Sequence, residues 1–251
     1  MKIRYAISGT LAVLVFVLIS SGFAQESARE IVQKIDELYR ASSSYAKMEM
    51  EITTPHWERT LRMETWTEGT DKTFIRITEP KKEAGTATLR LGNEMWNYLP
   101  RTNKVIKIPP SMMMSSWMGS DFTNNDLVQE FTLLEDYHFK IVQPDTSREG
   151  YLYIRAVPRE GKPIVWGKQL ITVREEDYIP VREEYYDEQG ELMRVLKFRD
   201  IRQLGGREIP TEMVMIPNTR EGHKTIIRYL DAKFNIEIEK EIFSLRNLRS
   251  Q

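Results

Sequence analysis

Apolar and polar residues alternate along most of the chain, and this alternation predicts a protein built mainly from β-strands. In the segment YAKMEMEIT every second residue is apolar, namely Ala46, Met48, Met50 and Ile52. Similar segments recur as far as HKTIIRYLDAKFN, separated by turn signals such as Gly92-Asn93 and Gly205-Gly206. We predict roughly ten or eleven short strands, joined mainly as hairpins into an antiparallel sheet with one dry face and one wet face.

One amphipathic helix is predicted ahead of the strands. Ser27 and Glu30 have the spacing of a capping box, in which each side chain binds the other residue's backbone N–H. Apolar residues then recur at helical spacing: Ala28, Ile31, Val32, Ile35, Leu38 and Tyr39. The apolar face of this helix needs a sheet to cover it.

A large antiparallel sheet with one apolar face must curl or be covered, because a flat open sheet would leave that face in water. Besides the helix, only the stretch from Pro109 to about Glu135 is available as a cover. We therefore predict one mainly β (α+β) domain. Its strongly curved sheet would be capped by two small helical pieces and would leave a partly filled apolar interior.

The covering stretch contains PSMMMSSWMGSDFTNNDLV and is rich in soft apolar side chains. It carries no charge between Lys107 and Asp121. Pro109-Pro110 would end the preceding strand, Ser111 could cap a helix and Gly119 could end it. Three side chains would then share one helical face: Met114, Trp117 and Met118.

Two roles are open for this stretch. Its side chains could plug the end of the sheet as ordinary core. Alternatively they could line a lid over a ligand, because methionine is flexible and adapts to variable apolar partners. Three consecutive methionines cannot all face one side of a helix, which favours the second role. Thr123 and Asp126 repeat the capping-box spacing before another apolar run.

The N-terminus has the features of a secretory signal peptide. Lys2 and Arg4 precede an apolar stretch, and Ala24 offers a small residue at a cleavage site. We predict a signal peptide over residues 1–24 and an exported domain over residues 25–251. An uncleaved anchor is the alternative, since the same apolar stretch could just span a bilayer.

Charge and residue types argue against several classes of function. The 36 basic and 37 acidic residues are interspersed, so nothing indicates binding to nucleic acid or to an anionic membrane. The chain has no cysteine, and its histidines lack metal-site spacing: His56, His138 and His223. Glu183-Glu184 is interpreted as solvent-exposed charge. We expect a monomer with no metal, no cofactor and no enzymatic activity.

Several stretches together resemble the outer-membrane lipoprotein-sorting protein family, whose members are similar to the periplasmic lipoprotein carrier LolA. The matching stretches are MWNYLP, the basic hairpin after it, SWMGSDFTNNDL, YIPVREEYYDEQGELMRVLKF, IPTEMVM and IFSLRNL. They span nearly the whole chain after residue 24. The resemblance implies an unclosed antiparallel β-barrel with a helical lid over a hydrophobic cavity.

The resemblance also implies a function. Family members carry the acyl chains of lipids or lipoproteins across the periplasm toward the outer membrane, often beside an inner-membrane transporter. The expected ligand contacts at the lid are Met112, Met113, Met114, Trp117, Met118 and Phe122. Those expected at the cavity are Trp96, Tyr98 and Leu99. The alternative class is a periplasmic sensor, similar to a regulator of anti-sigma factors, which binds lipoprotein or a membrane partner and signals by protein contact.

Two residues keep open roles. Trp66 is in phase with Arg62 and Glu64 on the expected wet face, so it could cover the helix or mark a partner surface. Asp121 could bind a cation, or it could cap a solvated turn.

Overall fold

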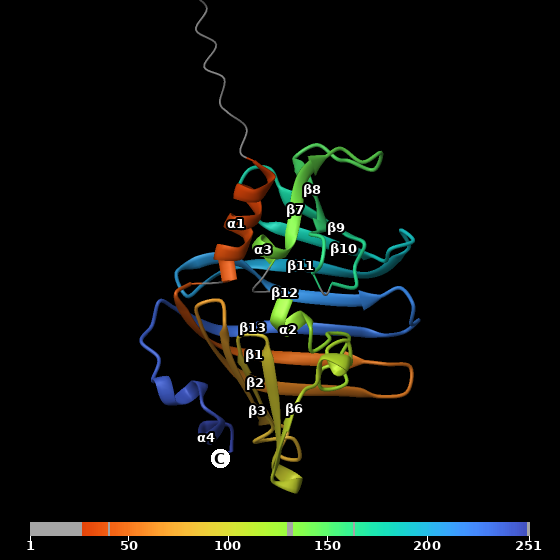
Figure 1. Cartoon of the computed structure of the whole chain (residues 1–251). Coiled ribbons are helices and arrows are strands. Elements are labelled where there is room, and N and C mark those ends of the chain that lie inside the picture. The colour runs from red at the N-terminus through yellow and green to blue at the C-terminus, as the bar shows by residue number, and fades with distance from the viewer. Residues whose placement is uncertain (1–26, 40, 130–132, 163, 250–251) are drawn as a thin grey trace, which may run out of the picture.

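The computed structural model describes residues 27–39, 41–129, 133–162 and 164–249 (Figure 1). The predicted signal peptide, residues 1–24, lies outside the described residues. In the described part, no helix is both long and apolar enough to cross a membrane.

Thirteen strands form one antiparallel sheet. They are β1 (Ser43–Thr53), β2 (Glu58–Glu68), β3 (Lys72–Glu79), β4 (Ala87–Leu91), β5 (Glu94–Leu99), β6 (Lys104–Lys107), β7 (Tyr137–Val142), β8 (Tyr151–Pro158), β9 (Lys168–Arg174), β10 (Pro180–Tyr186), β11 (Leu192–Leu204), β12 (Arg207–Pro217) and β13 (Lys224–Phe234). The predicted number was too low. Two alternating stretches, around Gly92-Asn93 and Asp187 to Gly190, contain their own turns and therefore fold as two strands each.

The order of the strands shows where the barrel is open. Each strand pairs with the next one along the chain, except that β6 does not pair with β7. Strand β1 also pairs with β13, and β6 and β7 form the two free edges of the sheet. The connection from β6 to β7 must therefore run from one edge of the sheet to the other (Figure 1). This connection contains the methionine-rich stretch, so the fold gives that stretch the position of a cover.

The predicted N-terminal helix is present as α1 (Ala28–Tyr39). The Ser27 backbone N–H donates to Glu30 Oε2 at 2.7 Å, and the Glu30 N–H donates to Ser27 Oγ at 3.3 Å, which confirms the capping box. The apolar face of α1 packs on the β8–β9 part of the sheet through Ile31, Val32 and Ile35. The other helical pieces are short: η1 (Pro100–Thr102), η2 (Pro110–Met112), α2 (Asp126–Gln129), α3 (Leu133–Asp136), η3 (Lys240–Phe243) and α4 (Leu245–Leu248).

The two faces of the sheet are both covered on the β1–β5 side. The inner face carries the main core, with Met48, Met50 and Met63 among its members. The outer face carries a second core, in which Phe74, Tyr98 and other side chains pack against the C-terminal stretch of η3 and α4. The sheet therefore has one dry face and one wet face, as the alternation predicted, only where the C-terminal stretch does not cover it.

Trp66 belongs to the outer core. Its ring lies 5.3 Å from that of Tyr45 and 5.7 Å from that of Phe74, centroid to centroid. It also packs in the cluster that includes Ile238 and Ile242 of the C-terminal stretch. Trp66 thus covers neither the N-terminal helix nor an open surface, because the end of the chain folds back over it.

The helix predicted between Ser111 and Gly119 is absent. After one turn of η2, the chain reverses at Met118 and Gly119, whose φ angles of 53° and 78° are both left-handed. The Trp117 N–H then donates to the Phe122 carbonyl oxygen at 2.8 Å, which makes a small hairpin. Two successive left-handed residues cannot continue a right-handed helix, so the sequence Met-Gly forms a turn here.

The second predicted capping box is confirmed. The Thr123 N–H donates to Asp126 Oδ2 at 2.7 Å, and the Asp126 N–H donates to Thr123 Oγ1 at 3.2 Å. It begins the short helix α2 and leaves the Asp126 carboxylate free to accept further hydrogen bonds.

Candidate ligand-binding cavity

A cavity of about 250 Å³ lies between the inner face of the sheet, α1 and the covering stretch. Much of its wall consists of apolar side chains from the central strands β1, β2, β11, β12 and β13. Five methionines contribute, which we call the methionine wall: Met48, Met50, Met63, Met213 and Met215. These methionines lie on strands rather than in the Met112–Met114 run, from which the sequence predicted ligand contacts.

The covering stretch forms the roof of the cavity through Trp117 and Phe122. We call residues 109–127 the roof segment. Trp117 is 2% exposed, and its indole Nε1–H donates to Thr88 Oγ1 on β4 at 3.1 Å. Arg59 of β2 donates a hydrogen bond to the carbonyl oxygen of Met118. The first half of the small hairpin is therefore attached to two strands, β2 and β4.

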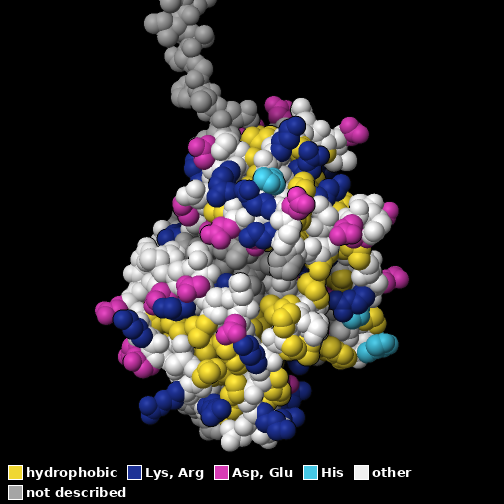
Figure 2. All heavy atoms as spheres, in the orientation of Figure 1, with side chains coloured by type: hydrophobic (Ala, Val, Ile, Leu, Met, Phe, Trp, Pro, Cys, Tyr) yellow, Lys and Arg dark blue, Asp and Glu magenta, His cyan; other side chains and the backbone are white. Residues whose placement is uncertain are grey.

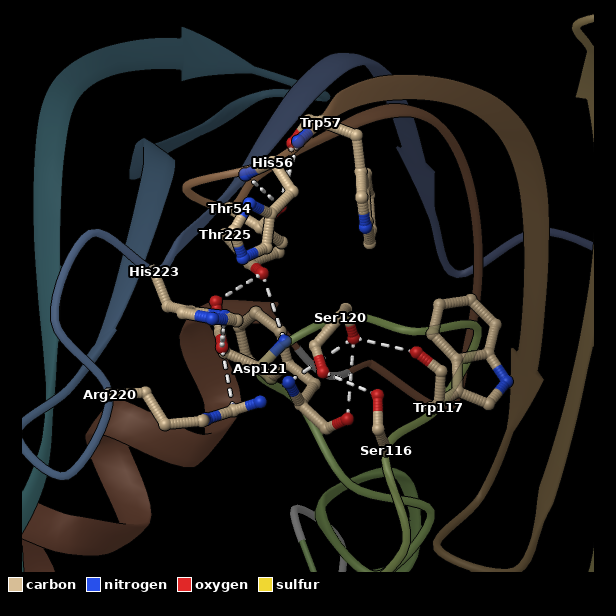
Figure 3. Close-up of polar contacts among 11 residues, drawn as sticks. Thr54, His56, Trp57, Ser116, Trp117, Ser120, Asp121, Arg220, His223 and Thr225 are labelled. Atoms are coloured by element: carbon tan, nitrogen blue, oxygen red, sulfur yellow. Dashed lines mark hydrogen bonds and ion pairs between the residues drawn. The ribbon is translucent and has the colours of Figure 1, made fainter.

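Asp121 is a further attachment of the roof segment (Figure 3). Its side chain is 2% exposed and lies 2.7 Å from Arg220 Nη2. The Thr225 hydroxyl donates to Asp121 Oδ2 at 2.8 Å, and the Asp121 N–H donates back to Thr225 Oγ1 at 2.9 Å. Asp121 is thus a buried ion-pair residue that ties the roof to β13, rather than a carboxylate of a solvated turn.

The predicted lid residues separate into buried and exposed groups. Trp117 and Phe122 line the cavity. Met118 packs on the inner core and Met113 packs beside Met95, both half-buried. Met112 and Met114 are 47% and 38% exposed, and apolar side chains show at the surface over this region in Figure 2. The helix that would have placed Met114, Trp117 and Met118 on one face is absent, so Met114 is exposed while Trp117 is buried.

The other three predicted contacts do not line the cavity. Trp96 and Tyr98 belong to the outer core, on the opposite face of β5. Leu99 ends the strand and is 37% exposed. Residues of a strand alternate between faces, and on β5 it is Met95 that packs with the roof segment through Met113.

A polar cluster at the β9–β11 end of the cavity was not predicted. Arg194 is 5% exposed, and its two Nη atoms donate to Asp126 at 2.7 and 2.5 Å. Its guanidinium carbon lies 4.5 Å from the Trp166 ring centroid and 4.2 Å from that of Tyr185. The sequence held one signal: Arg194 is in phase with Leu196 and Phe198, which placed a charge on the dry face.

Glu183 is the second unexpected member of this end of the cavity. It lines the cavity together with Gln169 and Tyr185, so it is not the solvent-exposed charge that the sequence suggested. The Tyr185 hydroxyl donates to Glu183 Oε2 at 2.7 Å. Burial raises the pKa of the Glu183 carboxyl group above its ordinary value, and burial likewise raises the pKa of the Tyr185 hydroxyl.

The raised pKa predicts a pH-dependent stability. Folded protein holds a proton on Glu183 more tightly than unfolded protein does, so the stability contributed by the protonated group is complete below pH 4.5 and falls as pH rises through the folded pKa. Tyr185, Arg194 and Asp126 are the titratable and charged groups acting on Glu183. The amide of Glu183→Gln does not ionise, so this variant does not lose that stability as pH rises.

We therefore expect the melting temperature of Glu183→Gln, relative to the native chain, to increase between about pH 4 and pH 8. Thermal unfolding across that range measures the difference. Glu184→Gln is the control, because the native Glu184 carboxylate binds Arg182 and Tyr186 outside the cavity. A difference between Glu183→Gln and the native chain that does not change with pH would contradict the assignment.

Comparison with known proteins places this geometry in a fold family. A family model described as "-like: Uncharacterized protein" matches residues 69–250. No curated protein matches. A DUF1329 family protein from Desulfovibrio piger is 22% identical with a TM-score of 0.78, and the alignment covers 88% of this chain and 97% of that one.

Two further structures agree with it. A domain from Vibrio parahaemolyticus named for outer membrane lipoprotein sorting is 23% identical, with a TM-score of 0.76 over 89% of this chain and 98% of that one. A LolA superfamily protein from Nitrosomonas europaea is 22% identical, with a TM-score of 0.74 over 89% of this chain and 100% of that one. The chain therefore belongs to the family of the matching model, and its unclosed thirteen-stranded sheet has the LolA-like fold that its sequence motifs predicted.

Proposed function

We propose that this protein is a periplasmic carrier that holds the acyl chains of lipids or lipoproteins in its cavity and takes part in their transport to the outer membrane. The observation that carries the proposal is the cavity itself, with the methionine wall on one side and Trp117 and Phe122 above it. The name of the Vibrio domain with the same fold supports lipoprotein sorting as the process.

The energetics suit such a role. Burying one methylene group gains about 0.8 kcal/mol, so exposing an acyl chain of roughly 14–16 carbons to water costs on the order of 10 kcal/mol. A carrier must supply comparable apolar burial, about 400–500 Å² at ~25 cal/mol per Å². Methionine side chains have several rotatable bonds, so the methionine wall can adjust to chains of different length.

The remaining steps of the proposed transport rest on the predicted signal peptide and on the family that the sequence motifs resemble. Export through the N-terminal segment would place the protein in the periplasm. An inner-membrane transporter would then load the cavity, and an acceptor at the outer membrane would empty it. Binding is non-covalent in this scheme and involves no catalytic step.

The test is to express the full chain with its own N-terminal segment, purify it gently from a bacterial periplasm and record its native mass spectrum. We expect added mass that solvent extraction identifies as acyl lipid or lipopeptide. Protein that arrives empty, and that also fails to bind a hydrophobic fluorescent probe such as N-phenyl-1-naphthylamine, would refute the carrier function.

A further inference from the structure

Glu183 lies at a polar end of the cavity, whose lining also includes polar residues elsewhere: Asp36, Ser44, Thr65, Thr67 and Thr73. Strand β10 points Glu183 and Tyr185 to the inner face, where they pair with Leu196 and Arg194 of β11. Gln169 and Asp126 line the same end. Away from this end the wall includes the methionine wall and the roof aromatics. The lining is therefore that of a site for an amphiphile, since one end offers polar atoms and the middle offers apolar surface.

Glu183 has no cation of its own among the described residues. Its carboxyl group accepts one hydrogen bond, from the Tyr185 hydroxyl, and no lysine, arginine or histidine nitrogen there lies within 4.0 Å of it. Arg194 does not pair with Glu183, because both of its terminal nitrogens bind Asp126. Arg194 and Asp126 balance each other, which leaves Glu183 as the excess carboxyl group at this end.

We propose that this end of the cavity binds the head of an amphiphilic ligand that carries a hydroxyl or ammonium group, in preference to one that carries a carboxylate. The inference rests on the proposed carrier function and names the class of cargo. A hydrogen-bond donor would meet a half-buried carboxyl group in the cavity wall that has acceptor capacity to spare. A carboxylate head would instead place a like charge beside Glu183 where little water screens it.

The position of the site within the cavity supports this assignment. Trp117 and Phe122 of the roof and the methionine wall line the same cavity as Glu183. An alkyl chain that lies against them can therefore have its head at Glu183. Burial raises the pKa of this carboxyl group, as expected for an acidic side chain that lines a largely apolar cavity.

The experiment compares three probes with the same twelve-carbon chain: dodecylammonium, dodecanol and laurate. Each competes with N-phenyl-1-naphthylamine for the purified full chain at neutral pH, below its micellar concentration. We expect dodecylammonium and dodecanol to bind at least about tenfold tighter than laurate. A tenfold difference in Kd corresponds to roughly 1.4 kcal/mol of binding free energy.

Three variants locate the effect. Glu183→Gln should lower the ratio of dodecylammonium to laurate affinity at least about fivefold while leaving dodecanol nearly unchanged, because the amide keeps its shape and loses its charge. Glu184→Gln, on the outer face, should leave all three affinities as they are. Tyr185→Phe removes the hydroxyl that donates to Glu183 and so leaves the carboxyl group with more acceptor capacity; the preference for dodecylammonium over laurate should rise, which tests the site if Glu183→Gln folds poorly.

The outcomes separate this inference from the carrier function. Equal binding of the three probes, preference for laurate, or a ratio that Glu183→Gln does not change would overturn the head-group assignment and leave the carrier function standing. Failure of all three probes and of the fluorescent dye to bind the native chain would overturn both.

Discussion

Replacing Trp117 with alanine is expected to reduce acyl-probe affinity at least about tenfold and to lower the free energy of unfolding by about 3–5 kcal/mol. Trp117 is almost fully buried, lines the cavity and joins the roof segment to Thr88. Its loss removes ligand contact area, leaves a hole in the roof and deprives the Thr88 hydroxyl of its donor. Displacement of N-phenyl-1-naphthylamine measures the affinity, and urea unfolding measures the stability.

Matched variants in the same segment distinguish the roof from its surroundings. Met112→Ala and Met114→Ala remove exposed side chains and should change stability by less than about 0.5 kcal/mol and affinity by less than twofold. Trp117→Phe keeps most of the ring area and should retain part of the affinity, which separates lost binding from lost folding. If Trp117→Ala remains folded and binds the probe as the native chain does, Trp117 is plain core.

Breaking the pair between Asp126 and Arg194 is expected to destabilise the protein by about 3–5 kcal/mol. Asp126→Asn leaves a guanidinium group, only 6% exposed, without its counter-charge. Arg194→Met in the Asp126→Asn background removes that charge and keeps an apolar side chain of similar length between Trp166 and Tyr185. The double variant should therefore recover most of the stability lost in Asp126→Asn, since the cost lies in the unpaired charge rather than in the missing pair.

The measurement is a double-mutant cycle by urea unfolding, with Arg62 and Glu79 as the comparison pair. Their side chains are 51% and 59% exposed, so water and salt screen them and the coupling should stay under about 1 kcal/mol. Additive losses at Asp126 and Arg194 would mean that the two groups do not act as a buried pair. The roof segment would then be held by the contacts of Trp117, Met118 and Asp121 with the sheet and with Arg220.

The sequence determined the secondary structure of this protein to a large extent, because its signals are local. Alternation of apolar residues specified the strands, and the spacing of Ser27 with Glu30 and of Thr123 with Asp126 specified two helix starts. The long motif match specified the fold family. The strand and capping signals each lie within a few residues or within one strand, and the motif match, although it spans nearly the whole chain, likewise needs no knowledge of distant contacts.

Only the tertiary structure decided which side chains face the cavity. Trp96 and Tyr98 lie on the outer face because the C-terminal stretch, far away in the sequence, covers that face and makes it a second core. The Met112–Met114 run is partly exposed because left-handed residues at Met118 and Gly119 turn the chain where a helix was expected.

The polar end of the cavity shows the same limit most clearly. Glu183 resembles a surface charge in the sequence, whereas Arg194 is in phase with Leu196 and Phe198, but nothing near either residue indicates its partner. In the folded chain Arg194 meets Asp126, which is 68 residues away, and Glu183 enters the cavity beside them. Partners brought together only by the closing of the sheet decide whether a charge is buried, and local sequence does not record them.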